Sequence, residues 1–143
     1  SKQDIITYSE SLFDNGFGCA ESVLMAVAMY KNIQSDLIPK IATGFCAGIG
    51  RTNNICGAVS GAILATNLIY GRNTLEEDKE ENYRKIQEFT EMFQTQFGSL
   101  HCPVLTGCDL STEEGRQQFE DMNIHPKCRE FVGEATKIVL SLI

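Results

Sequence analysis

The sequence predicts an all-α protein that folds as a single compact bundle of about five to six helices. Two observations carry this prediction. Apolar residues recur at steps of three and four through most of the chain, which is the spacing of one helix face. The alternation of apolar and polar residues that marks a half-buried strand is absent. The 143 residues, of which 43% are hydrophobic, suit one domain with one core over residues 1–143.

The first half of the chain is predicted to contain four helices. Residues 4–15 form an amphipathic helix, and residues 20–30 are apolar nearly all round, which is typical of a buried helix. Ser35 can cap a third helix, which would carry Leu37 on its inner face. The longest apolar run, residues 55–70, predicts a helix at the centre of the core.

The second half is predicted to contain two long helices, which with the four of the first half make six, and a short, weak helical stretch between them. Asn73 begins a capping signal for a charged helix over residues 75–97. Residues 99–111 carry two cysteines and a proline, and we expect this segment to be irregular. A short, weak helix over residues 112–122 follows, and Pro126 is a favourable first residue for the last helix.

The charge and the apolar pattern exclude two classes of function. A net charge of −7 and the lack of a basic cluster argue against nucleic-acid binding, because nothing would neutralise phosphates. The apolar run of residues 55–70 is shorter than the ~20 residues of a membrane span, so we expect no stable membrane insertion. Residues 1–11 are polar and lack the apolar region of a secretory signal, so we expect a cytoplasmic protein.

Cysteine is the residue type that points to chemistry. Without a secretory signal, disulfide-framework cysteines are disfavoured, and metal ligands, redox thiols or small buried core residues remain. No Cys-x-x-Cys pair is present, so the fold would have to assemble any site from distant segments. The six cysteines are Cys19, Cys46, Cys56, Cys102, Cys108 and Cys128.

Four of these cysteines fall at or near predicted helix starts, where free N–H groups favour negative charge. They are Cys19, Cys56, Cys102 and Cys128. Asn54 is a suitable cap, which would place Cys56 in the first turn of its helix and lower its pKa. Arg51 nearby could lower that pKa further and could bind or orient an anion. Cys102 precedes Pro103 and is expected to be extended. The pattern predicts a convergent cysteine site with Cys56 as its central thiolate.

Other interpretations of nearby residues stay open. The glycine-rich segment Gly44–Arg51 lacks the spacing of a phosphate-binding loop, and close approach between helices explains its glycines equally well. His101 and His125 stand beside two of the cysteines and could ligate a metal or carry a proton, although loop histidines are more often only solvated.

Glycines and cysteines recur together in Gly18-Cys19-Ala20-Glu21-Ser22-Val23, Gly48-x-Gly50-Arg51, Cys56-Gly57-Ala58-Val59-Ser60-Gly61, Cys102 and Cys128. These segments resemble the redox-active protein family named after its C_GCAxxG_C_C pattern. The resemblance covers nearly the whole chain. It implies that four cysteines share a redox role. Either Cys102 or Cys108 is the third of them, and the spacing after the long helix and Gly98-Ser99 favours Cys102, which makes Cys46 and Cys108 extras. Similar domains occur fused to electron-transfer modules, which implies an iron–sulfur cluster or another thiolate-bound metal as a candidate cofactor.

Three hypotheses follow. The first is a redox-active protein, an oxidoreductase by type, that exchanges thiols and disulfides or transfers electrons through an iron–sulfur or metal site to an unidentified redox partner. The second is a non-redox module that binds a thiophilic metal. The third is a structural or interaction domain with buried cysteines. Helix faces rich in small residues permit a homodimer without requiring one.

Overall fold

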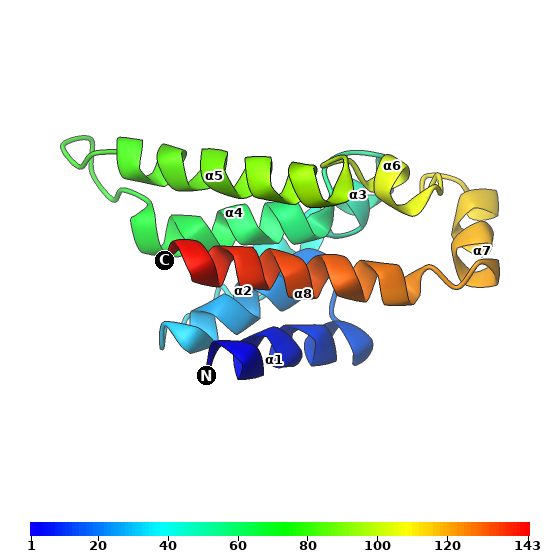
Figure 1. The fold of residues 1–143 in the computed structure, drawn as a ribbon, viewed down its shortest axis with the longest axis horizontal. Coiled ribbons are helices and arrows are strands. Elements are labelled where there is room, and N and C mark those ends of the chain that lie inside the picture. Colours follow the sequence, from blue (N-terminus) through cyan, green and yellow to red (C-terminus); the bar gives the residue numbers. More distant parts are fainter.

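The computed structural model describes residues 1–143 as an all-helical fold without extended strands (Figure 1), which confirms the predicted fold class. It has eight α-helices and one 3₁₀-helix, so the expected number of five to six helices is wrong. The elements are α1 (Lys2–Asp14), α2 (Cys19–Tyr30), η1 (Lys40–Phe45), α3 (Cys46–Arg51), α4 (Gly57–Tyr70), α5 (Glu80–Phe97), α6 (Cys102–Thr106), α7 (Glu113–Asp121) and α8 (His125–Leu142).

The additional helices are short and lie in segments that were expected to be irregular or glycine-broken. Both α3 and α6 belong to this class. The helix predicted after Ser35 is instead a turn followed by η1, and Leu37 is exposed rather than inward-facing. A proline at position 39 explains this difference, because it disfavours helical geometry in the residue before it and lacks an N–H donor. The long charged helix α5 begins at Glu80, several residues later than predicted.

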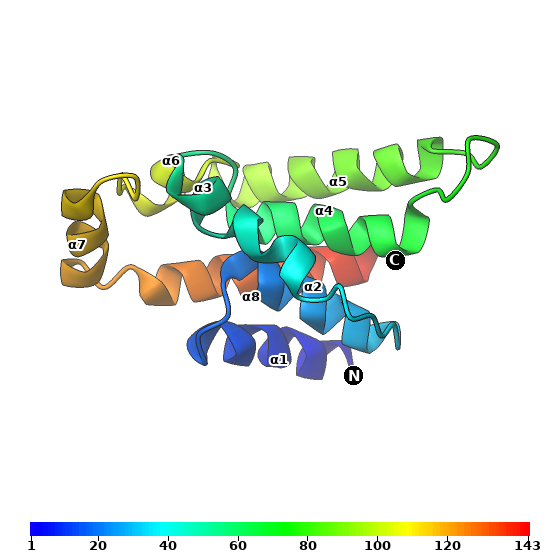
Figure 2. The same ribbon diagram turned by 180° about the vertical axis from the view of Figure 1, so that it is seen from behind.

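The helices α2, α4 and α8 form the centre of the molecule, with α1 packed on α2 and α8, and α5 packed on α4 and α8 (Figures 1 and 2). Large apolar side chains such as Phe89, Phe93 and Phe131 are buried between them. Small residues bring α2 and α4 together. A Cβ added at Gly61 would lie 2.6 Å from the carbonyl oxygen of Ala20, so only glycine permits this approach.

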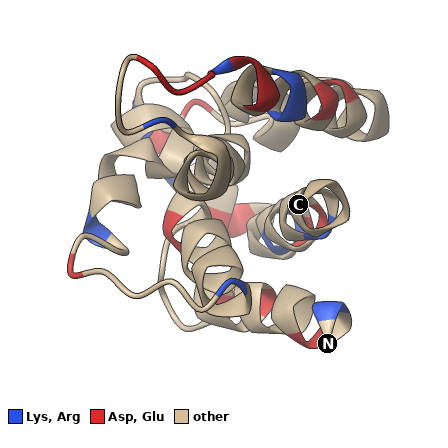
Figure 3. Ribbon diagram, turned by 90° about the vertical axis from the view of Figure 1, so that its left-hand side faces the viewer, with Lys and Arg blue, Asp and Glu red and all other residues tan.

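The short elements gather at one end of the bundle. The helices α3 and α6 lie at the end where α2, α4 and α8 begin, and α7 crosses this end beyond them (Figures 1 and 2). Four helix starts that carry cysteines therefore meet in one region. The opposite end, which carries both termini, displays Lys and Arg interspersed with Asp and Glu (Figure 3). None of the helices has the length and apolar character needed to cross a membrane.

Candidate functional site

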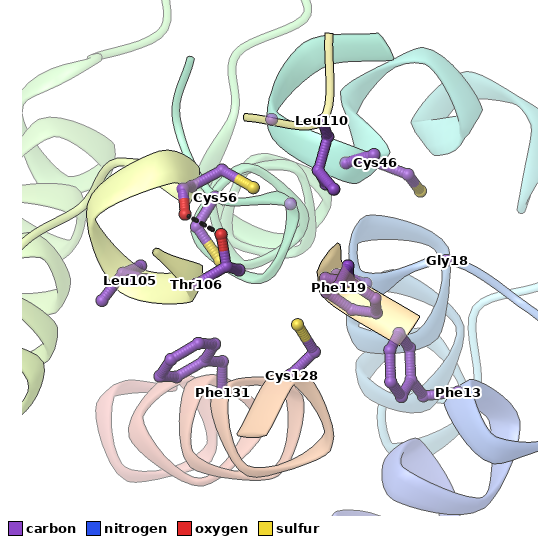
Figure 4. A pocket seen from close by; sticks show the side chains of 15 residues that line it. Phe13, Gly18, Cys46, Cys56, Leu105, Thr106, Leu110, Phe119, Cys128 and Phe131 are labelled. Carbon is purple, nitrogen blue, oxygen red and sulfur yellow. Dashed lines mark hydrogen bonds between the residues drawn. The ribbon is translucent and has the colours of Figure 1, made fainter. Parts of the chain in front are cut away.

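A cavity of about 150 Å³ lies at this end of the bundle, and cysteines supply much of its wall (Figure 4). The rest of the lining is glycine, alanine and larger apolar side chains, apart from the hydroxyl of Thr106, which donates to the carbonyl oxygen of Cys102 at 2.8 Å. An apolar lining of this kind disfavours ordered water. The cysteines that line the cavity are Cys19, Cys46, Cys56, Cys102 and Cys128. All four cysteines singled out by the sequence are thus brought to one cavity.

Paired backbone hydrogen bonds hold Cys56 and Cys102 beside each other. The N–H of Cys56 donates to the carbonyl of Leu100 at 2.8 Å, and the N–H of Cys102 donates to the carbonyl of Asn54 at 2.9 Å. These bonds flank an isolated antiparallel bridge between the residues that precede the two cysteines. Two helix starts that are distant in sequence are therefore fixed in register, and these backbone hydrogen bonds position both thiols without the help of side-chain contacts.

Cys19 and Cys128 form the second pair, at the start of α2 and in the first turn of α8. The two thiols lie within reach of each other, and a hydrogen bond from Cys19 to the sulfur of Cys128 is the largest influence on both pKa values. This bond lowers the pKa of Cys128 below the usual cysteine value, and the charge of Lys127 adds to the effect against the opposing effect of burial. The same bond, together with burial, raises the pKa of Cys19 well above its usual value. Cys128 is therefore the cavity thiol that ionises first.

The prediction that the helix start lowers the pKa of Cys56 is wrong. Burial raises its pKa to about 12, although the N–H groups of Ala58 and Val59 act in the opposite direction. Cys56 is itself the N-cap residue of α4, with φ −53° and ψ 134°. The amide of Asn54 does not cap this helix but donates to the carbonyl and hydroxyl oxygens of Thr52. At this helix start, burial away from water raises the pKa of the thiol by more than the backbone N–H groups lower it.

Cys102 also differs from its prediction. It is the first residue of α6 rather than an extended residue before the helix, and Pro103 takes the second helical position. Proline is tolerated there because the N–H groups of the first turn have no partner within the helix. Burial raises the pKa of Cys102 to about 11, and the neighbouring Cys128 contributes to the rise. Cys102 is therefore a neutral thiol at physiological pH.

Three glycines make room for the cysteines, which the sequence interpretation did not anticipate. A Cβ at any of these positions would crowd a cysteine of another segment. The distances from such a Cβ are 2.3 Å to Cys46 Sγ at Gly18, 2.7 Å to Cys102 Cβ at Gly48 and 3.0 Å to Cys19 Cβ at Gly57. Close approach between helices explains Gly61 and also contributes at Gly57, where a Cβ would lie 3.2 Å from the backbone nitrogen of Ala20, while the absent side chains at all three positions allow the cysteines to converge.

The short helix α3 contains a left-handed turn. Residues 47–51 all have positive φ, between 56° and 68°. Left-handed geometry costs roughly 1–2 kcal/mol for each residue with a Cβ, and it is especially unfavourable for the β-branched Ile49. Hydrogen bonds to the carbonyl of Gly48 from the N–H groups of Thr52 and Asn54, at 3.3 and 3.0 Å, hold the turn. The turn places Ala47 and Gly48 on the cavity wall, so the strain coincides with the site.

Cys46 lines the cavity, yet its thiol interacts elsewhere. Its sulfur lies 3.8 Å from Oε1 of Glu21 and 3.7 Å from the carbonyl oxygen of Ala42. Figure 4 shows this sulfur directed away from those of Cys56 and Cys128. Burial raises the pKa of Cys46, and the carboxylate of Glu21 adds to the rise. Cys46 therefore stands apart from the convergent thiols, although it shares their cavity.

The remaining candidate residues lie outside the cavity. Cys108 is buried beside the carbonyl of Thr106, at 3.6 Å from its sulfur, and does not line the cavity. Arg51 is exposed and faces a separate surface depression. His101 is exposed, while Nε2 of His125 lies 3.0 Å from Oδ1 of Asp14. None of these side chains reaches the sulfurs directly.

Sequence reasoning missed part of the apolar wall. Phe119 and Leu110 come from the segment around α7 and close the outer side of the cavity. A signal for Phe119 is present, because it is the one large apolar residue in the polar stretch of residues 112–121. No local pattern marks Leu110. Its contribution depends on how α7 crosses the end of the bundle.

The donor set has the chemistry of a soft-metal site, since thiolates select copper(I), zinc and iron–sulfur clusters. The arrangement does not match that chemistry. Nowhere in the chain do three or more His, Cys, Asp or Glu side chains come together as a set that could hold a metal ion. The sulfurs that line the cavity do not surround a common centre in this conformation.

Comparisons with known proteins agree with the cysteine pattern. A model of the family described as "Putative redox-active protein (C_GCAxxG_C_C)" matches residues 17–142. An uncharacterized protein of Archaeoglobus fulgidus is 30% identical over 143 residues, an alignment that covers 93% of this chain and 89% of that protein. No solved structure matches the chain.

Proposed function

Because the chain belongs to the C_GCAxxG_C_C family, we propose that it is a thiol–disulfide redox protein whose working pair is Cys19 and Cys128. The observation that carries this proposal is that Cys19 and Cys128 line the same cavity and lie close enough for each thiol to shift the pKa of the other. A working dithiol needs one thiol that ionises easily and a second thiol close enough to resolve the mixed disulfide. This pair meets both requirements.

The exchange proceeds in two steps when a partner disulfide is the oxidant. The thiolate of Cys128 attacks one partner sulfur, a bond forms between them, and the other partner sulfur leaves as a thiolate. Cys19 then loses its proton to that thiolate and attacks the sulfur of Cys128. The mixed disulfide breaks, a Cys19–Cys128 disulfide forms, and the partner gains two electrons and becomes a dithiol. The reverse sequence oxidises a dithiol partner.

Cys56 and Cys102 have a different role in this proposal. Their pKa values, raised to about 12 and about 11, keep them protonated at neutral pH, so they do not initiate exchange. The backbone bridge between their segments keeps them adjacent to each other, in the same cavity as the working pair. They are the second candidate pair, available when the first has been oxidised.

Redox titration of the pure protein tests the proposal. Reduced protein is equilibrated anaerobically with thiol–disulfide buffers, the free thiols are alkylated, and peptides are identified by mass spectrometry. We expect one two-electron couple in which Cys19 and Cys128 become protected together. Cys19→Ser and Cys128→Ser should each abolish it, while Cys108→Ser, the matched control outside the cavity, should leave it unchanged. Absence of any couple, or a couple between other cysteines, contradicts the assignment.

A thiolate-bound metal or iron–sulfur cluster used in electron transfer is the second candidate function. Five cysteine side chains on one largely apolar cavity favour it, because such sulfurs are soft ligands. Binding would require the sulfurs to move together, and it would release the protons of the high-pKa thiols. Visible absorbance together with bound iron and sulfide after anaerobic purification supports this candidate. Bound zinc or copper without any redox change would instead support a thiophilic-metal module.

Other expectations remain predictions of this proposal. A cytoplasmic location would keep the thiols reduced, and cell fractionation tests it. Native mass spectrometry tests whether the protein forms a homodimer through its helix faces rich in small residues, and the same measurement detects bound metals. Slow labelling of all six thiols in the folded protein would favour a structural domain with buried cysteines instead. Lack of DNA or RNA binding at low salt is expected from the net charge of −7.

A further inference from the structure

The depression between α3 and α7 shares a wall with the cysteine cavity. It measures about 230 Å³, and its lining includes Ala47, Leu110 and Phe119, which also line the cavity. A passage between solvent and the sulfurs would therefore cross only the wall formed by these three residues, called here the partition. On the basis of the proposed thiol–disulfide function, we propose that the depression is the entry port of the site and that it takes a low-molecular-weight anionic disulfide.

The charge of the port supports an anionic ligand. Its charged side chains are Arg51, Arg116 and Glu120. The lining therefore carries two positive charges and one negative charge, in a protein of net charge −7. Neither arginine takes part in an ion pair of the chain, which leaves both positive charges uncompensated at contact distance. Guanidinium groups pair with carboxylates in a fork-like geometry. A carboxylate-bearing disulfide can therefore be held at the port while its sulfur faces the partition.

The partition is carried by a segment that is rigid within itself. Residues 109–116 are linked by hydrogen bonds from the Ser111 N–H to Oδ1 of Asp109 at 3.0 Å and from Nη1 of Arg116 to the carbonyl of Leu110 at 3.0 Å. Gly115 packs against the Asp109 carbonyl so closely that no side chain would fit. The segment that carries the outer wall can therefore move as one body.

The same segment is weakly attached to the rest of the protein. Its hydrogen bonds to a distant part of the chain come from the amide of Asn53 alone, to Oδ1 of Asp109 at 2.9 Å and to the hydroxyl of Ser111 at 3.4 Å. Gly107 lies before this segment and Asn123 lies after α7, which continues it, and both residues have positive φ. The helix α7 packs extensively against no other helix. Displacement of this segment would open the partition without disturbing the core.

Paired probes of different charge test the port. Reduced protein is mixed in a stopped-flow instrument with a dianionic aromatic disulfide (dithiobis-nitrobenzoate) and with a neutral one (dithiodipyridine). We expect Arg51→Gln and Arg116→Gln each to slow the anionic probe by roughly two- to fivefold, the range for exposed charge pairs. The neutral probe should be unaffected by Arg51→Gln. Arg51→Lys and Arg116→Lys should retain most of the rate, and Arg72→Gln, which lies just after α4 and does not line the port, is the matched control.

Two further results complete the test. Phe119→Ala should speed both probes alike, because it thins the partition without changing charge. Equal slowing of both probes by Arg51→Gln, or no slowing of either, overturns the port. The proposed function fails separately, if neither probe oxidises Cys19 and Cys128 in the unmodified protein. Loss of both reactions in Cys128→Ser, with charge selectivity intact in Cys108→Ser, ties the port to the working pair.

Discussion

Removing the thiol of Cys19 should make Cys128 a weaker acid, and this is the sharpest test of the site. The perturbation is Cys19→Ala, which deletes the hydrogen-bond donor but keeps the Cβ that packs beside Gly57. A hydrogen bond to a charged group contributes about 1.5–3 kcal/mol. Its loss should lower the thiolate fraction of Cys128 by roughly 10- to 100-fold at a pH below its pKa.

The matched control is Cys19→Ser, because a hydroxyl group still donates to the sulfur although it cannot form a disulfide. The assay is the pH dependence of Cys128 alkylation by iodoacetamide, read from the Cys128 peptide by mass spectrometry. We expect slow alkylation in Cys19→Ala, with a profile moved to higher pH, and rates near the original in Cys19→Ser. Identical profiles for the unmodified protein and Cys19→Ala would refute the pairing of these two thiols.

Three further predictions concern stability. Gly61→Ala should lower the free energy of unfolding by about 1–3 kcal/mol in urea titrations, because its Cβ would meet the backbone of Ala20, whereas Gly44→Ala, with open space, should change little. Cys56 has a pKa of about 12 in the folded protein and 9.0 in the unfolded chain. The free energy of unfolding should therefore fall as the pH rises above 9.0, because only the unfolded state releases this proton there. Cys56→Ser should flatten this alkaline loss. Gly48→Ala, at φ 65° and 2.7 Å from Cys102 Cβ, should both destabilise the fold and alter Cys102 labelling.

Much of the helical framework follows from local sequence signals. The starts of α2 and α8, and the placement of Cys19 and Cys128 in their first turns, agree with the apolar period and with Pro126. The placement of four cysteines at or near helix starts also follows from these signals. That these starts lie at one end of the bundle is a property of the helix order and not of any one motif.

The glycine-rich segment before α4 marks the limit of such reasoning. Its glycines indicated close packing, but its backbone forms a left-handed turn through Ala47 and Ile49, residues that disfavour this geometry. Only long-range contacts select it. The turn brings Gly48 against Cys102. The carbonyl of Gly48 accepts a hydrogen bond from the N–H of Asn54, whose own carbonyl accepts one from the N–H of Cys102. Local propensity favours another structure here, so no sequence pattern could have predicted it.

The four helix-start cysteines show why position alone does not make a reactive thiol. Backbone N–H groups act on the buried Cys56, yet burial raises its pKa to about 12. Cys128 is also buried, but the thiol of Cys19 donates to it and Lys127 lies next in the chain, so its pKa falls. A donor in direct contact therefore decides which sulfur ionises, while the helix start only places it. Chemistry at this cavity thus depends on a contact between α2 and α8, and substitutions that separate these helices should abolish the reactivity of Cys128 before they unfold the protein.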